Sequence, residues 1–372
     1  MVGLAMNERE YVSRKFVWLS FFAMVSVIMI HSISVLTTKS PAAWNVFAQH
    51  LLLRSFTYWA VPFFFMCSGF WFAKGKYVMR SVGEGPTVTV LAFWGKKVRT
   101  LLVPYVLWVL IAVVMILPLT LGNNYLMHRW LWERTFVDNA GVWGKVDGLF
   151  GIVCAQPSAN GPLWYLRALI LLFALAPIWR FVALRRWGWL ALLAFGWVEI
   201  FVCPIGIPQV HLGGSSVGWF VLGMAVALKG WENVRLPKCA VSLAACVWIA
   251  AALAKCFHMV GVDFIPCEWF WRINALIPLG GVVCLWGLYD HCRVSSIEPR
   301  PWMRATFWVF CFHQIPISYF MAICLYVFGK GDGMTLLIAL ANVAFVAYLS
   351  FAIAGCAKRR FGACYHLLTG GR

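Results

Sequence analysis

The residue of this chain best suited to chemistry is His31, which lies near the end of the apolar run 16–36. A charged side chain at membrane depth costs about 2.5–3.5 kcal/mol on insertion scales, so an ionisable residue there usually marks a site or a pathway. Histidine also moves protons readily near pH 7. His31 is therefore either a general base that takes a proton from an acceptor hydroxyl during acyl transfer, or a histidine bonded to a backbone carbonyl or a serine within a helix bundle.

Basic residues gather in front of two apolar runs. Arg14 and Lys15 precede the first run, and Lys96, Lys97 and Arg99 precede a later one. Cations one helical turn apart can grip phosphate groups, arginine by paired hydrogen bonds and lysine as a point charge. They would suit a nucleotide-bearing donor such as an acyl-coenzyme A. The alternative is that these clusters only set the membrane topology.

A pair of small residues, Ser68-Gly69, lies near the end of the second apolar run. Small residues either permit close helix packing or leave room for a thioester or an acyl chain. Ser68 is therefore a candidate donor-binding residue together with Lys96, Arg99 and Arg14.

Three further ionisable residues lie inside later apolar runs. Arg167 follows Trp164 and Tyr165 near a predicted helix start, where it either faces protein and water or reaches the interface. Glu199 is its candidate counter-charge, and His313 is a second histidine at membrane depth. The alternative for His313 is a satisfied core side chain beside a proline kink. The candidates for holding an acceptor substrate are therefore Trp164, Tyr165, Arg167, Glu199 and His313.

Motifs of other enzyme classes are missing from the sequence. It has no P-loop, no H-E-x-x-H and no G-x-G-x-x-G that opens a βαβ unit. Its 13 cysteines include no C-x-x-C pair and no Cys/His cluster with zinc-like spacing. We therefore expect no metal site and no haem.

The composition predicts a membrane protein. Apolar residues make up 62% of the chain and charged residues 12%, against about 25% charged in soluble domains. Lipid must therefore act as the solvent. The net charge of +18 lies in short clusters between apolar runs, which argues against a nucleic-acid partner and favours topology signals and membrane lipids as partners.

The apolar runs predict an all-α polytopic bundle of ten transmembrane helices. The expected spans are 16–36, 51–73, 101–121, 163–179, 187–204, 213–229, 239–256, 268–288, 305–328 and 333–356. With both termini cytoplasmic, the inner segments hold 22 of the 31 lysines and arginines and the outer segments 8. This asymmetry obeys the positive-inside rule, so the span count and the orientation support each other.

The sequence predicts one membrane-embedded domain over residues 1–372, with the first run kept as a helix because it is longer than the core of a cleaved signal. The long outer connection 122–162 combines aromatic residues with carboxylates. Loops of this length are uncommon unless they are functional. The connection either contacts a sugar ring or forms an amphipathic helix on the membrane surface.

Several of these segments together resemble acyltransferase family 3, the ten-helix membrane acyltransferases that modify bacterial cell-surface glycans. The matching segments are 27–32 (VIMIHS), 61–70 (VPFFFMCSGF), 96–99 (KKVR) before Pro104-Tyr105 and Trp108, 161–167 (GPLWYLR) and 312–317 (FHQIPI). Each segment is weak evidence by itself, but the set follows the family's order over nearly the whole chain.

The resemblance implies a multi-pass protein of the bacterial inner (plasma) membrane. Its implied reaction is transfer of an acyl group, most often acetyl, from cytoplasmic acyl-coenzyme A to a hydroxyl of a cell-surface or lipid-linked glycan. The residue essential for transfer in that family maps to His31. The family's Arg-x-x-Arg pair for coenzyme A maps to Lys96 and Arg99. Where the family often has Arg or Lys, this chain has Ser20, so either Arg14 and Lys15 substitute for that cation or donor binding is organised differently.

A rival function belongs to a different class. Intramembrane His31, Arg167 and Glu199 would also suit a secondary transporter or flippase for a glycan, lipid or anion. Such transporters often carry internal repeats, and the sequence shows none. Binding of coenzyme A would separate the two functions.

Overall fold

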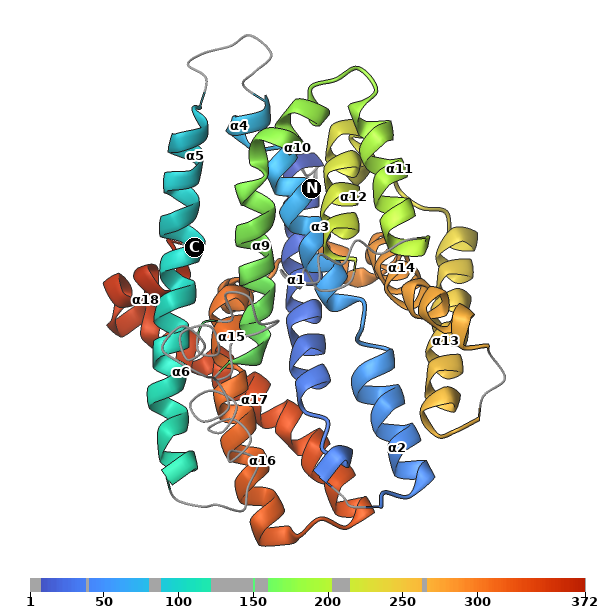
Figure 1. Cartoon of the computed structure of the whole chain (residues 1–372), viewed down its shortest axis with the longest axis vertical. Helices are drawn as coiled ribbons and strands as arrows, with labels where there is room; N and C mark the ends of the chain where they lie inside the picture. Colours follow the sequence, from blue (N-terminus) through green and yellow to red (C-terminus); the bar gives the residue numbers. More distant parts are fainter. Residues whose placement is uncertain are drawn as a thin grey trace, which may run out of the picture.

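The computed structural model describes residues 8–37, 40–79, 88–121, 150, 160–202, 215–262 and 266–371. Regular structure in these ranges is entirely helical, which confirms the predicted all-α class (Figure 1). The α-helices are α1 (Glu8–His31), α2 (Ala43–Gln49), α3 (Ala60–Ala73), α4 (Lys76–Met79), α5 (Val90–Lys97), α6 (Val103–Leu121), α9 (Trp164–Ala174), α10 (Ala176–Ala183), α11 (Gly188–Phe201), α12 (Ser216–Lys229), α13 (Lys238–Met259), α14 (Cys267–His291), α15 (Thr306–Phe312), α16 (Gln314–Phe328), α17 (Asp332–Arg360) and α18 (Gly362–Thr369).

Short segments of tighter or wider helix join these elements. The 3-10 segments are η1 (Val35–Thr37), η6 (Gly161–Leu163), η7 (Trp231–Asn233), η8 (Arg293–Ser296) and η9 (Pro301–Ala305). The π segments are η2 (His50–Ser55), between α2 and α3, and η4 (Val98–Leu102), between α5 and α6. Such wide turns often occur at functional sites, and each of these two carries an arginine, Arg54 and Arg99.

Six helical stretches of the described chain are long and apolar enough to cross a membrane: Glu8–His31, Ala43–Ala73, Val90–Met115, Lys238–Met259, Arg272–His291 and Asp332–Arg360. Two more candidates are bent pairs, α9 with α10 at 60° and α15 with α16 at 68°. The protein is therefore a multi-pass membrane protein with six to eight candidate spans.

Each of the ten expected spans contains a helix, but the count of ten stays a prediction. The spans 187–204 and 213–229 correspond to α11 and α12, which have 14 residues each. A helix of that length measures about 21 Å, less than the roughly 30 Å of a hydrocarbon core.

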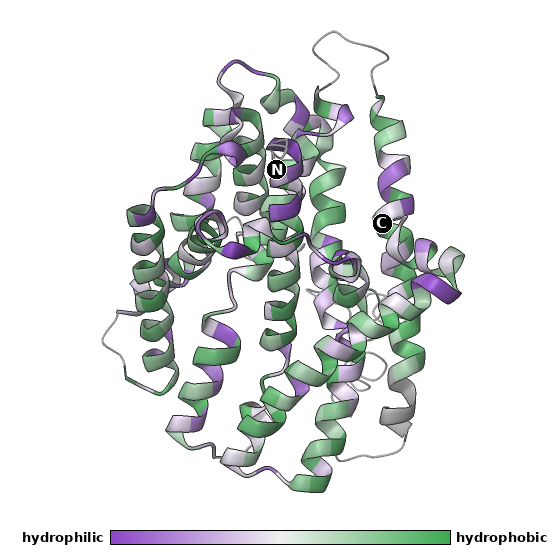
Figure 2. Ribbon diagram, turned by 180° about the vertical axis from the view of Figure 1, so that it is seen from behind, coloured by the Kyte–Doolittle hydropathy of each residue, from purple (hydrophilic) through white to green (hydrophobic). Residues whose placement is uncertain are grey.

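The bundle is built around α1, which packs against α3, α14, α15 and α17 (Figure 1). Hydrophobic residues, drawn in green, predominate in most of the helices (Figure 2). Large apolar side chains also face outward, as with Leu91 at 73% exposure and Tyr348 at 77%. Such exposure fits helices solvated by lipid.

Helices α3 and α12 touch through two glycines. A Cβ atom at Gly69 would overlap the carbonyl oxygen of Phe220, and a Cβ atom at Gly223 would overlap that of Met66. Small residues let membrane helices approach closely. This face of α3 is therefore fixed by packing, while the neighbouring Ser68 points into a cavity.

Candidate functional site

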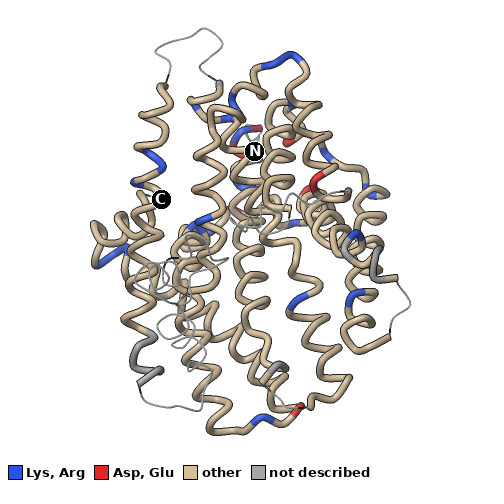
Figure 3. Tube along the Cα trace, in the orientation of Figure 1, with Lys and Arg blue, Asp and Glu red and all other residues tan. Residues whose placement is uncertain are grey.

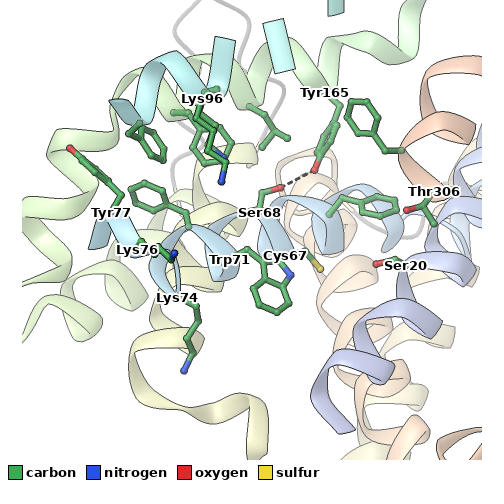
Figure 4. A pocket seen from close by; sticks show the side chains of 18 of the residues that line it. Ser20, Cys67, Ser68, Trp71, Lys74, Lys76, Tyr77, Lys96, Tyr165 and Thr306 are labelled. Carbon is green, nitrogen blue, oxygen red and sulfur yellow. Dashed lines mark hydrogen bonds between the residues drawn. The ribbon is translucent and has the colours of Figure 1, made fainter. Parts of the chain in front are cut away.

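A cavity of about 820 Å³ lies between α3, α4, α5, α9 and the segment from η9 to α15. Aromatic residues form much of its wall, and polar groups lie at both of its ends (Figure 4). A cavity of this size falls within the range of small-molecule sites. Its lining residues are Ser20, Phe64, Cys67, Ser68, Trp71, Phe72, Lys74, Gly75, Lys76, Tyr77, Val88, Ala92, Phe93, Lys96, Lys97, Tyr165, Leu169, Phe173, Arg304, Thr306, Phe307 and Phe310.

One end of the cavity is cationic. Lys76, Lys96 and Lys97 reach it from α4 and α5. A further cation of the lining, Arg304, comes from η9, two residues before Thr306. Lys76, Lys96 and Arg304 are exposed to solvent. Lysines and arginines in this arrangement suit phosphate groups. A fifth cation, Lys74, is already bound to Glu232 at 2.6 Å.

The other end of the cavity carries hydroxyl groups. Ser68 Oγ and Tyr165 Oη share a hydrogen bond of 3.1 Å between α3 and α9. Figure 4 shows these two side chains pointing toward each other, with Ser20 and Thr306 on the side away from the lysines. Hydroxyl groups can donate a hydrogen bond to a substrate oxygen as well as accept one.

Two histidines lie close together beyond this end. The ring centroids of His31, at the end of α1, and His313, between α15 and α16, are 5.3 Å apart. His313 is fully buried, and its Nδ1 is 2.7 Å from the carbonyl oxygen of Phe310. Because a carbonyl only accepts, Nδ1 carries the hydrogen, and the neutral ring presents Nε2 as an acceptor. That Nε2 has no partner within the described chain.

Phe310 separates the cavity from the histidine pair. It lines the cavity, and its ring centroid is 5.3 Å from that of Tyr165 and 6.0 Å from that of His313. His31 is half-buried and does not line the cavity. The Phe310 ring therefore lies next to both Tyr165 of the hydroxyl pair and His313.

The break between α15 and α16 positions His313. Pro316, in the first turn of α16, has no N–H group to continue a helical ladder from α15, and the two helices meet at 68°. The N–H of His313 still bonds the carbonyl of Val309 at 2.9 Å. The ring is thus fixed at a bend instead of lying along a straight span.

Three of the predicted donor and acceptor residues meet at the cavity: Lys96, Ser68 and Tyr165. Trp164, the neighbour of Tyr165, packs beside Phe65 with ring centroids 5.9 Å apart. The structure also brings the predicted residues His31 and His313 together, which the sequence did not predict as a pair.

The predicted residues Arg14 and Arg99 do not line this cavity. Arg14 bonds Glu10 at 2.5 Å, and Arg99 is exposed in η4. The neighbouring Lys15 is buried in α1, where its Nζ lies 2.8 Å from both carboxylate oxygens of Asp290 on α14. Lys15 therefore joins two helices.

Arg167 and Glu199 are both buried, at 6% and 1% exposure. Glu199 Oε2 accepts the backbone N–H of Gly218 at 3.1 Å, which ties α11 to α12. The ion pairs between described residues do not include Arg167 with Glu199. Their roles toward an acceptor stay predictions. The connection 122–162 lies largely outside the described residues.

Sequence reasoning missed Lys76 and Arg304 at the cavity and the intramembrane cations Arg54 and Lys255. Arg304 directly precedes the predicted span 305–328, where a basic residue indicates membrane topology. Arg54 and Lys255 stand near the edges of predicted spans, where the same interpretation applies. In the described part of the chain, no three His, Cys, Asp or Glu side chains gather as they would around a metal.

Comparison with known proteins gives one informative match. A family model described as an acyltransferase domain, of acyltransferase family 3, matches residues 17–357. Neither the curated proteins nor the solved structures give a match. The matched range includes both histidines and every residue that lines the cavity.

Proposed function

Because this chain belongs to acyltransferase family 3, we propose that it moves an acyl group, most often acetyl, from cytoplasmic acyl-coenzyme A to a hydroxyl of a cell-surface or lipid-linked glycan. The observation that carries this proposal is the cavity, with cations at one end and paired hydroxyls next to two histidines at the other. Coenzyme A has the same polarity, with phosphates at one end and the thioester at the other.

The cationic end would bind the nucleotide part of the donor. Lys76, Lys96 and Lys97 would supply charges for its phosphates, with Arg304 as a further cation of the lining, and the aromatic wall suits the pantetheine arm. Lysines and arginines of the described chain are concentrated in the upper half of the bundle (Figure 3). By the positive-inside rule this end would face the cytoplasm.

The acceptor hydroxyl would attack the thioester carbon with help from the histidines. His31 takes the hydroxyl proton as the new C–O bond forms, and the proton passes to the coenzyme A sulfur as the C–S bond breaks. His313, whose ring centroid is 5.3 Å from that of His31 and whose Nε2 has no partner in the described chain, would exchange a proton with His31 through a water molecule. The hydroxyl pair of Ser68 and Tyr165 would stabilise the negative carbonyl oxygen of the intermediate.

The acceptor would approach from the side of His31 opposite the lysines. Trp164 and Tyr165, at the start of α9, would contact a sugar, and Arg167 follows them on the same helix. We expect the segment 122–162 to contribute on this side as well. This part of the proposal rests on the residue types and their order in the chain.

A pair of donors tests the proposal. Purified protein in nanodiscs is offered radiolabelled acetyl-coenzyme A or acetyl-pantetheine, which has the thioester without the nucleotide. We expect acetyl-coenzyme A to bind more tightly than acetyl-pantetheine. Lys96→Gln and Arg304→Gln should each reduce the ratio of the two affinities by about tenfold. Lys238→Gln, an exposed lysine outside the cavity, is the control. Equal binding of both donors by wild type would contradict the proposal, and no binding of either would favour the transporter.

A further inference from the structure

A second group of cations lies inside the bundle, away from the donor cavity. Arg54 belongs to η2, Tyr58 to the turn that follows it, and Lys255 to α13. Lys255 Nζ lies 3.6 Å from the centroid of the Tyr58 ring, and both cations interact with the Tyr58 hydroxyl. Lys255 is 7% exposed and Arg54 is half-buried. None of these three residues lines the cavity that holds Lys96.

No carboxylate compensates these charges in the described part of the chain. The ion pairs there join Arg14 to Glu10, Lys15 to Asp290 and Lys74 to Glu232. Lys15 provides a comparison, because it is also buried in a candidate span but forms an ion pair with Asp290, whereas Lys255 forms none with a described carboxylate. Charges at membrane depth are costly and mark substrate or ion sites when they are retained. Two of them beside one tyrosine suit an anion.

The segment that carries Arg54 packs against the helix that ends at the proposed base. Segment η2 contacts both α1 and α13, and Gln49, directly before His50, accepts the N–H of Ser34, three residues after His31, at 2.9 Å. His50 is 1% exposed, and its Nδ1 has no partner in the described chain. The contacts of η2 thus connect the cation group with the end of α1.

The local backbone explains how η2 presents these residues. His50, Arg54 and Tyr58 follow one another at intervals of four residues, and the N–H of Phe56 bonds the carbonyl of Leu51 at 3.3 Å in a wide π turn. Such turns interrupt α-helical packing and recur at functional sites. Next to them, Ser55 Oγ and Cys256 Sγ are 3.3 Å apart, which keeps η2 against α13.

We propose that Arg54, Tyr58 and Lys255 bind an anionic group of the acyl acceptor, a phosphate or a carboxylate, and so hold the acceptor hydroxyl beside His31. This inference rests on the proposed function and names the substrate class that it uses. Arginine and lysine bind the anion by charge-assisted hydrogen bonds, and the tyrosine hydroxyl donates a further one. The phosphate source is a polyprenyl-linked glycan, and the carboxylate source is an acidic sugar.

The test measures anion binding without turnover. Wild-type protein in a neutral detergent is titrated with geranyl diphosphate or methyl glucuronoside, each beside its neutral counterpart, geraniol or methyl glucoside. We expect one of the two anionic probes to raise the Tm more than its neutral counterpart does. The probe that does so shows whether the bound anion is a phosphate or a carboxylate. Arg54→Gln and Lys255→Gln are expected to weaken the apparent affinity at least about tenfold, whereas Arg54→Lys and Lys255→Arg retain most of it.

Two controls make the result decisive. Lys330→Gln removes one exposed positive charge elsewhere and should leave the affinity unchanged. Acetyl-coenzyme A binding should stay within about twofold of wild type in every variant, which also shows that the variants are folded. The inference is overturned if neither anionic probe outperforms its neutral counterpart, or if Lys330→Gln weakens binding as much as Lys255→Gln. A wild-type protein that does not bind acetyl-coenzyme A would instead overturn the proposed function.

Discussion

His31 and His313 bring their imidazole rings to 5.3 Å, at an angle of 52°, although one ends the first helix and the other lies at a bend near the end of the chain. His313 is fixed by the carbonyl of Phe310 so that its Nε2 is left as an acceptor. A histidine held in one tautomer next to another histidine is an arrangement suited to directed proton transfer. The first two predictions concern this pair.

Replacing His31 with alanine should abolish acyl transfer without loss of donor binding. General bases typically contribute 10²–10⁴-fold to a rate, so we expect transfer to fall by about that factor. The cavity does not include His31, and the affinity for acetyl-coenzyme A should therefore change little. Turnover and equilibrium binding of radiolabelled acetyl-coenzyme A measure both quantities, and normal transfer by this variant would remove His31 from the mechanism.

The variant His313→Gln keeps a polar side chain but replaces the imidazole with an amide. We expect kcat to fall by roughly 10- to 100-fold while the KM for acetyl-coenzyme A stays nearly constant. His313→Ala should do the same and also reduce the Tm, because the Phe310 carbonyl loses a buried hydrogen bond. A change in Tm with full kcat would show that His313 is structural.

Tyr165→Phe removes one hydroxyl of the pair at the end of the cavity. Ser68 Oγ would then lose its 3.1 Å partner, and the carbonyl oxygen of the thioester would lose a donor. Loss of one such donor costs about 10²–10³ in kcat in well-studied acyl-transfer enzymes. Steady-state kinetics check this, with Tyr77→Phe as a control because Tyr77 lies at the lysine end of the same cavity (Figure 4). Equal effects of both variants would argue against a role for Tyr165 in the reaction.

Gly69→Ala should destabilise the bundle. The added methyl group would overlap the Phe220 carbonyl, and overpacking of this kind costs about 1–3 kcal/mol. Gly95→Ala is the matched control, because a Cβ atom there meets nothing within 4 Å. Thermal unfolding in detergent should show a lower Tm for Gly69→Ala and an unchanged or higher Tm for Gly95→Ala. Identical Tm values would mean that α3 and α12 do not depend on this contact.

Lys15→Met should be strongly destabilising, because it leaves Asp290 buried without its cation. Breaking one side of a buried pair costs about 3–5 kcal/mol. The double variant Lys15→Met with Asp290→Leu should recover much of that stability. Arg14→Gln removes an exposed pair with Glu10 and should cost at most about 1 kcal/mol. A double variant less stable than Lys15→Met would contradict this account.

Much of the architecture is predictable from the sequence, because the length and apolar composition of a segment are enough to identify a membrane helix. The runs containing His31, Ser68 and Lys96 follow this rule, and helices occupy all ten predicted spans. The site is predictable only where single residues are conspicuous. His31 stands out because an ionisable group in an apolar run has few structural explanations.

The rest depends on contacts between segments that are distant in the sequence. Arg304 looks like any basic residue before a span, and only the fold places it in the lining of the same cavity as Lys96. Arg54 and Lys255 lie on different helices, so neither run reveals that both meet Tyr58. The bends at Leu175 and His313 likewise shorten spans whose composition predicts straight helices.

The contact between α3 and α12 links positions that would otherwise vary independently. Gly69 accommodates the backbone of Phe220, and Gly223 accommodates the backbone of Met66. Ser68 stands next to one of these glycines, so any substitution that increases the distance between α3 and α12 also moves the wall of the cavity. During divergence of relatives, substitutions at the two glycines are therefore expected to occur together, and to be accompanied by changes in the acyl groups that the cavity accepts.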